Sequence, residues 1–127
     1  MENGESSKRP HERLDVWRDA MALVEVVYRL SGGFPDSERF GLTSQMRRCA
    51  ISVPSNIAEG AARRSTAEYL RFLSIARGSL PELDTQLQIA SRLDYSVTSP
   101  ELSRLVDSVF ARLTALMNSL EKAGSAR

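Results

Sequence analysis

The chain has 127 residues, one cysteine and a net charge of +1. This length suits a single domain that can bury its own core, and one cysteine excludes an internal disulfide or a cysteine-based metal site. Leu, Ala, Arg and Glu recur while Gly and Pro are few, so we expect an all-α protein. No apolar run is long enough to be a membrane span or signal segment, which predicts a cytoplasmic location.

Residues 1–13 are polar and unpatterned, and we expect them to form a flexible tail that contains the only histidine, His11. From Leu14 to Gly32 the apolar residues form two adjacent helical stripes. The two stripes are Leu14, Trp17, Met21, Val24 and Tyr28, and Val16, Ala20, Leu23, Val27 and Leu30. This face is wider than one partner helix needs, which predicts either an interface with another chain or a fully buried first helix.

A helical turn is expected over 36–40, and a second helix from about Leu42 until Gly60 closes it. Cys49 lies on the apolar face of that helix, where a buried thiol is favoured over a reactive one. Ser65 and Glu68 form a capping box that predicts the start of a third helix, continuing to about Asp94.

The sequence Ser99-Pro100-Glu101 combines a capping serine, a first-turn proline and an acid, which predicts the start of the last helix. Gly124 is expected to end it. We therefore predict an antiparallel, up-and-down four-helix bundle over 14–123, with a C-terminal tail over 124–127.

The second helix contains a proline, although its apolar spacing is helical. Pro54 removes the hydrogen bond to the Ala50 carbonyl, at a cost of about 3 kcal/mol inside a helix. We predict a kink there, supported by hydroxyl groups, with polar side chains that contact the 60–65 connection or a neighbouring chain. The kink serves either packing alone or a partner site. The residues of this structural motif are Ser52, Pro54, Ser55, Asn56, Glu59 and Gly60.

Several segments of the chain are similar to a known family. They are SVPSNIAEG at 52–60, FP at 34–35, ERFGL at 38–42, QMRR at 45–48, RS at 64–65, EYLRFL at 68–73 and ARGSLPEL at 76–83. Together they resemble the four-helix bundle proteins encoded within 23S rRNA intervening sequences, over roughly residues 14–120. More distantly, the chain is similar to the accessory variability determinant of diversity-generating retroelements.

The resemblance implies a four-helix protomer that assembles as a ring-like homopentamer and displays basic residues to nucleic acid. It does not imply a catalytic activity, and we expect no cofactor. One departure lies at Leu93-Asp94-Tyr95, where the family tends to have Gly before the Tyr. An Asp takes the left-handed conformation less easily than Gly, so the end of the third helix is the least certain element.

Charge is distributed unevenly along the chain. Residues 43–81 hold six basic and two acidic side chains, whereas the segments on both sides have an acidic excess. The candidate nucleic-acid-binding residues are Arg47, Arg48, Arg63, Arg64, Arg71 and Arg77. They are expected either to form one positive surface for RNA or DNA backbones, or to be solvated or paired across subunit contacts.

The sequence does not indicate a catalytic site. The only His lies in the predicted tail, and no nucleophile–base set, phosphate loop or metal-binding Glu-x-x-His pair occurs. We therefore expect a non-enzymatic binder of nucleic acid. The alternative is a protein–protein adaptor or purely structural assembly, for example with a reverse transcriptase as partner.

Overall fold

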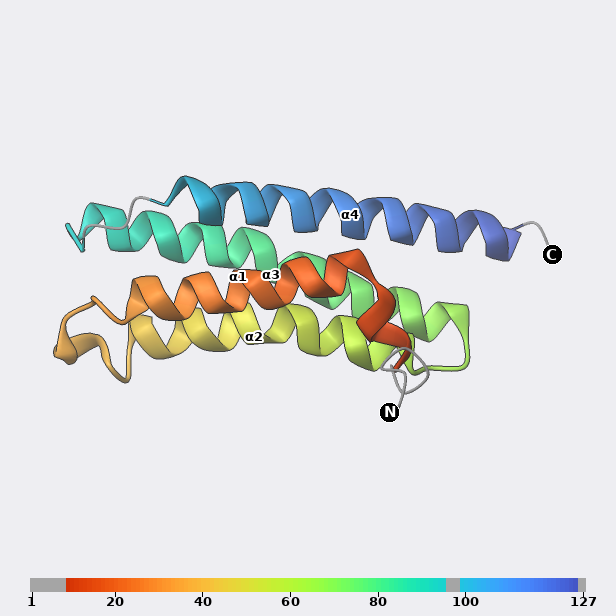
Figure 1. Cartoon of the computed structure of the whole chain (residues 1–127), viewed down its shortest axis with the longest axis horizontal. Helices are drawn as coiled ribbons and strands as arrows, with labels where there is room; N and C mark the ends of the chain where they lie inside the picture. The colour runs from red at the N-terminus through yellow and green to blue at the C-terminus, as the bar shows by residue number, and fades with distance from the viewer. Residues whose placement is uncertain (1–8, 96–98, 126–127) are drawn as a thin grey trace, which may run out of the picture.

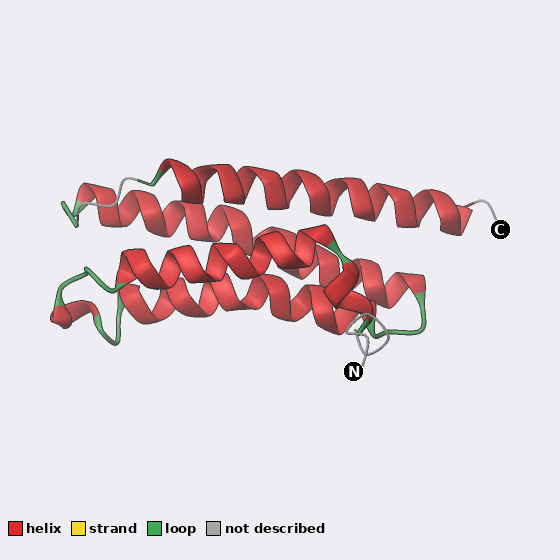
Figure 2. Ribbon diagram, in the orientation of Figure 1, coloured by secondary structure: helices red, strands yellow, loops and turns green. Residues whose placement is uncertain are grey.

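The computed structural model describes residues 9–95 and 99–125, and within these ranges it holds four long helices and no strand (Figures 1 and 2). The helices are α1 (Asp15–Ser31), α2 (Leu42–Ala61), α3 (Thr66–Arg92) and α4 (Pro100–Ser125). Both α1 and α3 pack against α2 and against α4. The all-α prediction is confirmed, and the arrangement is consistent with a four-helix bundle.

The core runs along the axis between the four helices. All four contribute side chains that are fully withdrawn from water, and burial of such side chains is the main driving force for helix packing. The largest are Leu23, Met46, Ile57, Leu73, Leu80, Leu83, Leu102 and Leu113. The helical spacing of apolar residues in the sequence thus corresponds to the face that each helix turns inward.

Two helices begin as the sequence predicts. Ser65 Oγ accepts the backbone N–H of Glu68 at 3.1 Å and caps α3. Ser99 Oγ accepts the backbone N–H of Leu102 at 3.0 Å, directly before α4. Each hydroxyl satisfies one of the amides that a helix leaves free at its start.

The ends of the predicted domain need correction. Residues 1–8 and 126–127 lie outside the described residues, but Pro10–Arg13 form a short 3₁₀ helix, η2, rather than a flexible tail. It is held by packing, since η2 contacts α1 and α2 and the His11 ring meets the Trp17 ring edge to face at 4.9 Å. Gly124 does not end the last helix, because α4 continues to Ser125.

The two stripes of α1 are buried to different degrees. Val16, Ala20, Leu23 and Val27 are buried against the other helices. The other stripe remains partly in water: Trp17 and Val24 are half-buried, whereas Met21 and Tyr28 are exposed. The structure therefore excludes a fully buried first helix within one chain.

A short 3₁₀ helix, η3 (Asp36–Glu38), lies between α1 and α2 and brings one carboxylate to the end of α3. Glu38 accepts the Leu42 backbone N–H at 3.0 Å and the Tyr95 hydroxyl at 2.7 Å. Both bonds lower the pKa of Glu38, and the same carboxylate raises the pKa of Tyr95. We call Glu38, Leu42 and Tyr95 the clasp.

The end of α3 is a Schellman motif built on a non-glycine residue. Asp94 has φ of +61°, its N–H bonds the Ser91 carbonyl at 3.1 Å, and the Tyr95 N–H bonds the Ala90 carbonyl at 3.0 Å. The Asp thus adopts the left-handed conformation that glycine takes without a steric cost.

We expect Asp94→Gly to raise the free energy of unfolding by about 1 kcal/mol, because it removes this steric cost and an unfavourable charge at the negative end of the helix dipole. Urea denaturation of the two proteins measures the difference. Asp84→Gly is the matched control: Asp84 lies inside α3, so that variant should be less stable than the wild type. A destabilised Asp94→Gly variant would contradict this explanation.

Candidate nucleic-acid interface

Three of the six candidate arginines come together at the turn between α2 and α3. Arg63 and Arg64 lie in the connection and Arg71 lies in the second turn of α3. The guanidinium carbons of Arg63 and Arg71 are 5.0 and 4.8 Å from the centroid of the same Phe72 ring. Arg63 also pairs with Glu59 at 2.6 Å. We call Arg63, Arg64 and Arg71 the arginine cluster.

Gly60 allows this arrangement, because α2 and α3 approach each other closely at its Cα. A Cβ atom added at Gly60 would lie 2.9 Å from Phe72 Cβ and 3.0 Å from Tyr69 Cδ1, closer than real Cβ contacts come. Because Gly60 has no side chain, α3 can pack close enough to α2 for the Phe72 ring to lie at this turn. The guanidinium groups of Arg63 and Arg71 lie against that ring.

The electrostatic surroundings of the arginine cluster favour an anion. Residues 62–65 and Glu68 line a surface hollow of about 400 Å³. The hollow lies beside the first turn of α3, where the helix dipole adds partial positive charge. Within the described part of the chain neither Arg64 nor Arg71 forms an ion pair, and Arg71 lies against the Phe72 ring. Together they leave charge available to a phosphate.

Arg47 and Arg48 are neighbours in sequence but have different environments. Arg47 crosses to the end of α1: its Nε donates to Ser31 Oγ at 2.8 Å, and Nη2 donates to the Tyr28 carbonyl at 3.3 Å. Its guanidinium carbon also lies 4.4 Å from the Tyr28 ring centroid. Arg47 thus joins α1 to α2 and is half-buried, whereas Arg48 is exposed.

Arg77 lies between α3 and α4. It donates to Thr114 Oγ1 at 3.1 Å and its guanidinium carbon is 5.5 Å from the Phe110 ring centroid. Along α2, about 20 Å of helix axis separates Arg48 from Ala61. The six arginines therefore lie in three different environments on one chain, and the single positive surface stays a prediction.

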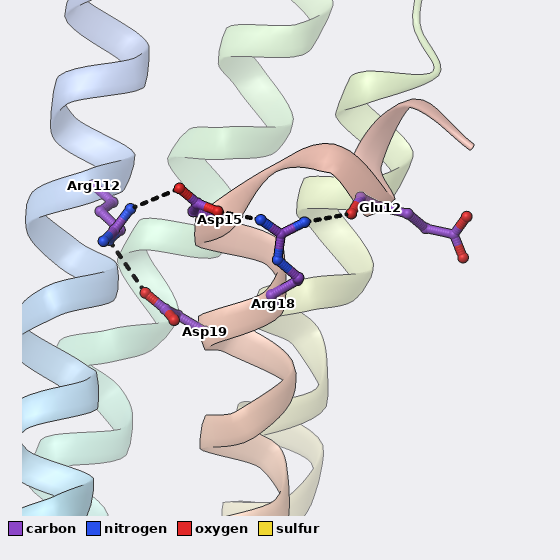
Figure 3. A network of polar contacts seen from close by, with 5 residues as sticks. All are labelled: Glu12, Asp15, Arg18, Asp19 and Arg112. Carbon is purple, nitrogen blue, oxygen red and sulfur yellow. Dashed lines mark hydrogen bonds and ion pairs between the residues drawn. The ribbon is translucent and has the colours of Figure 1, made fainter. Parts of the chain in front are cut away.

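Sequence reasoning did not find the most connected ion pairs, which lie between α1 and α4 (Figure 3). Arg112 of α4 contacts Asp15 at 3.6 Å and Asp19 at 3.2 Å. Arg18 bridges Asp15 and the Glu12 carbonyl, and so ties η2 to α1. The one-turn spacing of Asp15 and Asp19 was visible in the sequence, but their partner on α4 depends on which helices are neighbours.

Comparison with protein families gives one match, in which residues 12–117 correspond to the family described as 23S rRNA-intervening sequence protein. The chain belongs to this family. The match covers α1, α2, α3 and most of α4, together with the arginine cluster. No curated protein matches the chain.

The segment SVPSNIAEG of this intervening-sequence family member forms a continuous part of α2, with Pro54 inside it. Ser52 Oγ donates to the Cys49 carbonyl at 2.7 Å and lies 2.6 Å from Ser79 Oγ of α3. Ser52 therefore bonds the backbone one turn away, as predicted, and also links α2 to α3. The predicted kink at Pro54 stays a prediction.

The remaining polar residues of the motif divide between the helix and its connection. Asn56 bonds within α2, donating to the Ser52 carbonyl at 2.7 Å rather than to the connection, and its alternative contact with a neighbouring chain stays a prediction. Glu59 does reach the connection, through Arg63. Ser55 is exposed, and α2 ends at Ala61 rather than at Gly60.

Cys49 is buried, as predicted, and its Sγ lies 3.1 Å from the Ser79 carbonyl. Burial raises the pKa of the thiol to about 12, and the nearby Glu82 carboxylate acts in the same direction. The folded state therefore keeps the thiol protonated well above pH 9, and this contribution to stability is lost as the pH rises from the unfolded pKa toward 12.

We expect Cys49 in the native protein to resist a disulfide reagent such as dithionitrobenzoate at pH 8, because the thiolate is the reactive form and is scarce there. The same protein in guanidinium chloride should react completely within minutes and serves as the control. Rapid stoichiometric labelling of the native protein would show instead that the α2–α3 seam opens readily.

The described residues form neither a metal-binding group nor a membrane-spanning helix. It contains no group of three or more His, Cys, Asp or Glu side chains that could hold a metal ion. None of its helices is both long and apolar enough to cross a bilayer.

Proposed function

We propose that this family member is a non-enzymatic, cytoplasmic accessory or scaffold protein that binds the phosphate backbone of RNA or DNA through the arginine cluster. The observation that carries the proposal is the pairing of Arg63 and Arg71 on the single ring of Phe72, with Arg64 beside them. Since both guanidinium carbons lie within 5.0 Å of one centroid, they are at most twice that far apart, on the scale of neighbouring phosphates.

The cluster favours contact with phosphates over contact with bases. Proteins that stack bases present open aromatic faces. Here the aromatic side chain nearest the cluster already carries two guanidinium groups, which are suited to bidentate phosphate contacts. We therefore expect binding that depends strongly on salt and little on nucleotide sequence.

The test is the affinity for a generic structured RNA and for duplex DNA of equal length, measured by fluorescence anisotropy at about 50 and 200 mM salt. The R63A/R64A/R71A variant should bind more weakly to every sequence, with a salt slope reduced by about 2 to 3. R92A/R104A/K122A is the matched control, because it loses the same charge from exposed positions elsewhere.

Each result has a distinct meaning. An equal loss of affinity in both triple variants would assign binding to net charge and would remove the cluster from the proposal. Absence of binding at 50 mM salt would retire the nucleic-acid function altogether.

We further propose that the bundle is antiparallel and up-and-down, and that it assembles with itself. The short connections and the course of the chain in Figure 1 support the topology. Support for assembly comes from the exposed stripe of α1, since contiguous apolar surface usually marks an interface. The family resemblance adds a pentamer as the expected number of subunits, which native mass spectrometry measures directly.

The predicted kink at Pro54 is part of the proposed self-association. Pro54 is buried on the side of α2 that faces the exposed stripe of α1. Its missing N–H is a local reason for α2 to bend there. A bend would shape the surface through which copies meet, so Pro54→Ala is expected to change the subunit number while the bundle stays folded.

The alternative is a protein–protein adaptor, with a partner such as a reverse transcriptase. It is favoured by Phe40, which is 88% exposed and lines a surface hollow together with Arg39 and Arg48. An adaptor would keep its partner after nuclease treatment and would not respond to R63A/R64A/R71A.

A further inference from the structure

Phe40 is the most exposed large apolar side chain in the described part of the chain. It lies in the connection before α2, and the Arg39 guanidinium carbon is 5.3 Å from its ring centroid. The ring remains 88% exposed beside this guanidinium group. Exposed aromatic rings of this kind are frequent anchors of protein interfaces.

An apolar hollow of about 330 Å³ lies on the seam between α1 and α2. We call it the α1/α2 hollow. Most of its wall is apolar, and it is open to solvent beside Met21 and Ile51, which are each 40% exposed. The side chains that line it are mainly Trp17, Met21, Val24, Ile51, Pro54 and Ala58.

Phe40 does not line the α1/α2 hollow of its own chain. About 14 Å of helix axis separates Leu42, the first residue of α2, from Ile51, the first α2 residue in the wall of the hollow. The ring instead borders a neighbouring hollow, next to Tyr28 and Arg48, and Ile51 belongs to the walls of both hollows. Each chain therefore presents an open apolar hollow and, beside it on the same side of the bundle, an exposed ring that does not line that hollow.

The charges around the two features are complementary. The exposed Arg39 and Arg48 flank Phe40. Glu25 is exposed on α1 one turn after Met21, and it forms no ion pair with any residue from 9 to 95 or 99 to 125. A second copy of this chain can therefore provide an aromatic ring for the apolar hollow and a positive charge for Glu25 beside it.

We propose that Phe40 of one copy inserts into the α1/α2 hollow of the next copy, with Arg39 facing the partner's Glu25. The inference rests on the proposed self-association and specifies which residues form the contact between subunits. In a heterologous arrangement each copy places its ring in one neighbour and receives the ring of another, and repetition of this contact closes a ring or extends a filament, whereas mutual exchange between two copies would give a dimer.

The first test compares single variants by native mass spectrometry and sedimentation velocity. Phe40→Ala removes the anchor and should raise the subunit dissociation constant by about 30-fold or more. Met21→Asp places a charge in the wall of the hollow, at a position that is exposed in the folded chain, and should raise the dissociation constant by a similar factor. Ile89→Ala is the control, since Ile89 on α3 is 44% exposed, close to the 40% of Met21, and lines neither hollow. Circular dichroism verifies that each variant is folded.

The second test mixes the two disrupted variants. Met21→Asp retains Phe40, and Phe40→Ala retains an open hollow, so one productive contact remains possible between them. The mixture should form one-to-one pairs and nothing larger. Trp17, the only tryptophan, lines the hollow of the Phe40→Ala partner, and its emission should shift to the blue on mixing.

The outcomes separate this inference from the proposal on which it rests. A wild type that stays monomeric at all concentrations overturns self-association itself. A wild-type assembly that Phe40→Ala leaves unchanged overturns the Phe40 contact alone. Variants that are each monomeric but form no pairs on mixing also overturn it, because Phe40 would then meet a surface other than the hollow.

Discussion

Gly60→Ala is expected to lower the free energy of unfolding by about 1 to 3 kcal/mol, although alanine is the better helix former. The added Cβ would lie 2.9 Å from the Cβ of Phe72, an atom fixed to the backbone of α3. The helices must therefore separate at this point or the Phe72 ring must move. Urea denaturation measures the loss.

Gly78→Ala is the matched control for Gly60→Ala. Gly78 is exposed inside α3, and an added Cβ would meet nothing within 4 Å. This variant should gain about 0.5 to 1 kcal/mol from helix propensity alone. If both variants were stabilised, the close approach of α2 and α3 at Gly60 would be refuted.

Arg47→Ala is expected to cost about 2 kcal/mol of stability, whereas Arg48→Ala should change stability by less than about 0.5 kcal/mol. Arg47 provides two hydrogen bonds and a cation–π contact that hold the last turn of α1 against α2. Arg48 is exposed and makes no comparable contact among the described residues. Thermal and urea unfolding of the two variants gives the comparison.

The same pair of variants also tests nucleic-acid binding at this end of the bundle. We expect weak effects from both, because the arginine cluster lies at the other end of α2. Equal stability of the two variants would show that the contacts of Arg47 contribute nothing net. A large loss of affinity in Arg48→Ala alone would extend the interface along α2.

Features that depend on local sequence were predictable. The serines at positions 65 and 99 began the helices where a hydroxyl can satisfy a free amide. Apolar spacing placed the inward faces, including that of Cys49. The resemblance also identified the family, because it rested on several motifs distributed over most of the chain.

Features that depend on which helices are neighbours were not predictable. Arg47, Arg63 and Arg77 are equally basic in the sequence, yet Ser31, Phe72 and Thr114 give them three different environments. The start of the chain was misjudged for a similar reason. Residues 10–13 carry no apolar pattern, and their order comes from the contact of His11 with Trp17 and from Arg18.

The clasp connects residues 57 positions apart and is the only described polar link between Tyr95, just after α3, and the start of α2. Because the pKa of Glu38 is lowered in the folded protein, the stability it supplies is complete above the unfolded pKa of about 4.5 and is lost as the pH falls through the lowered value. Acid should therefore open this end of the bundle by local unfolding. The Leu42 amide would lose its protection from hydrogen exchange before the amides in the middle of the helices, while the Gly60 end stays closed.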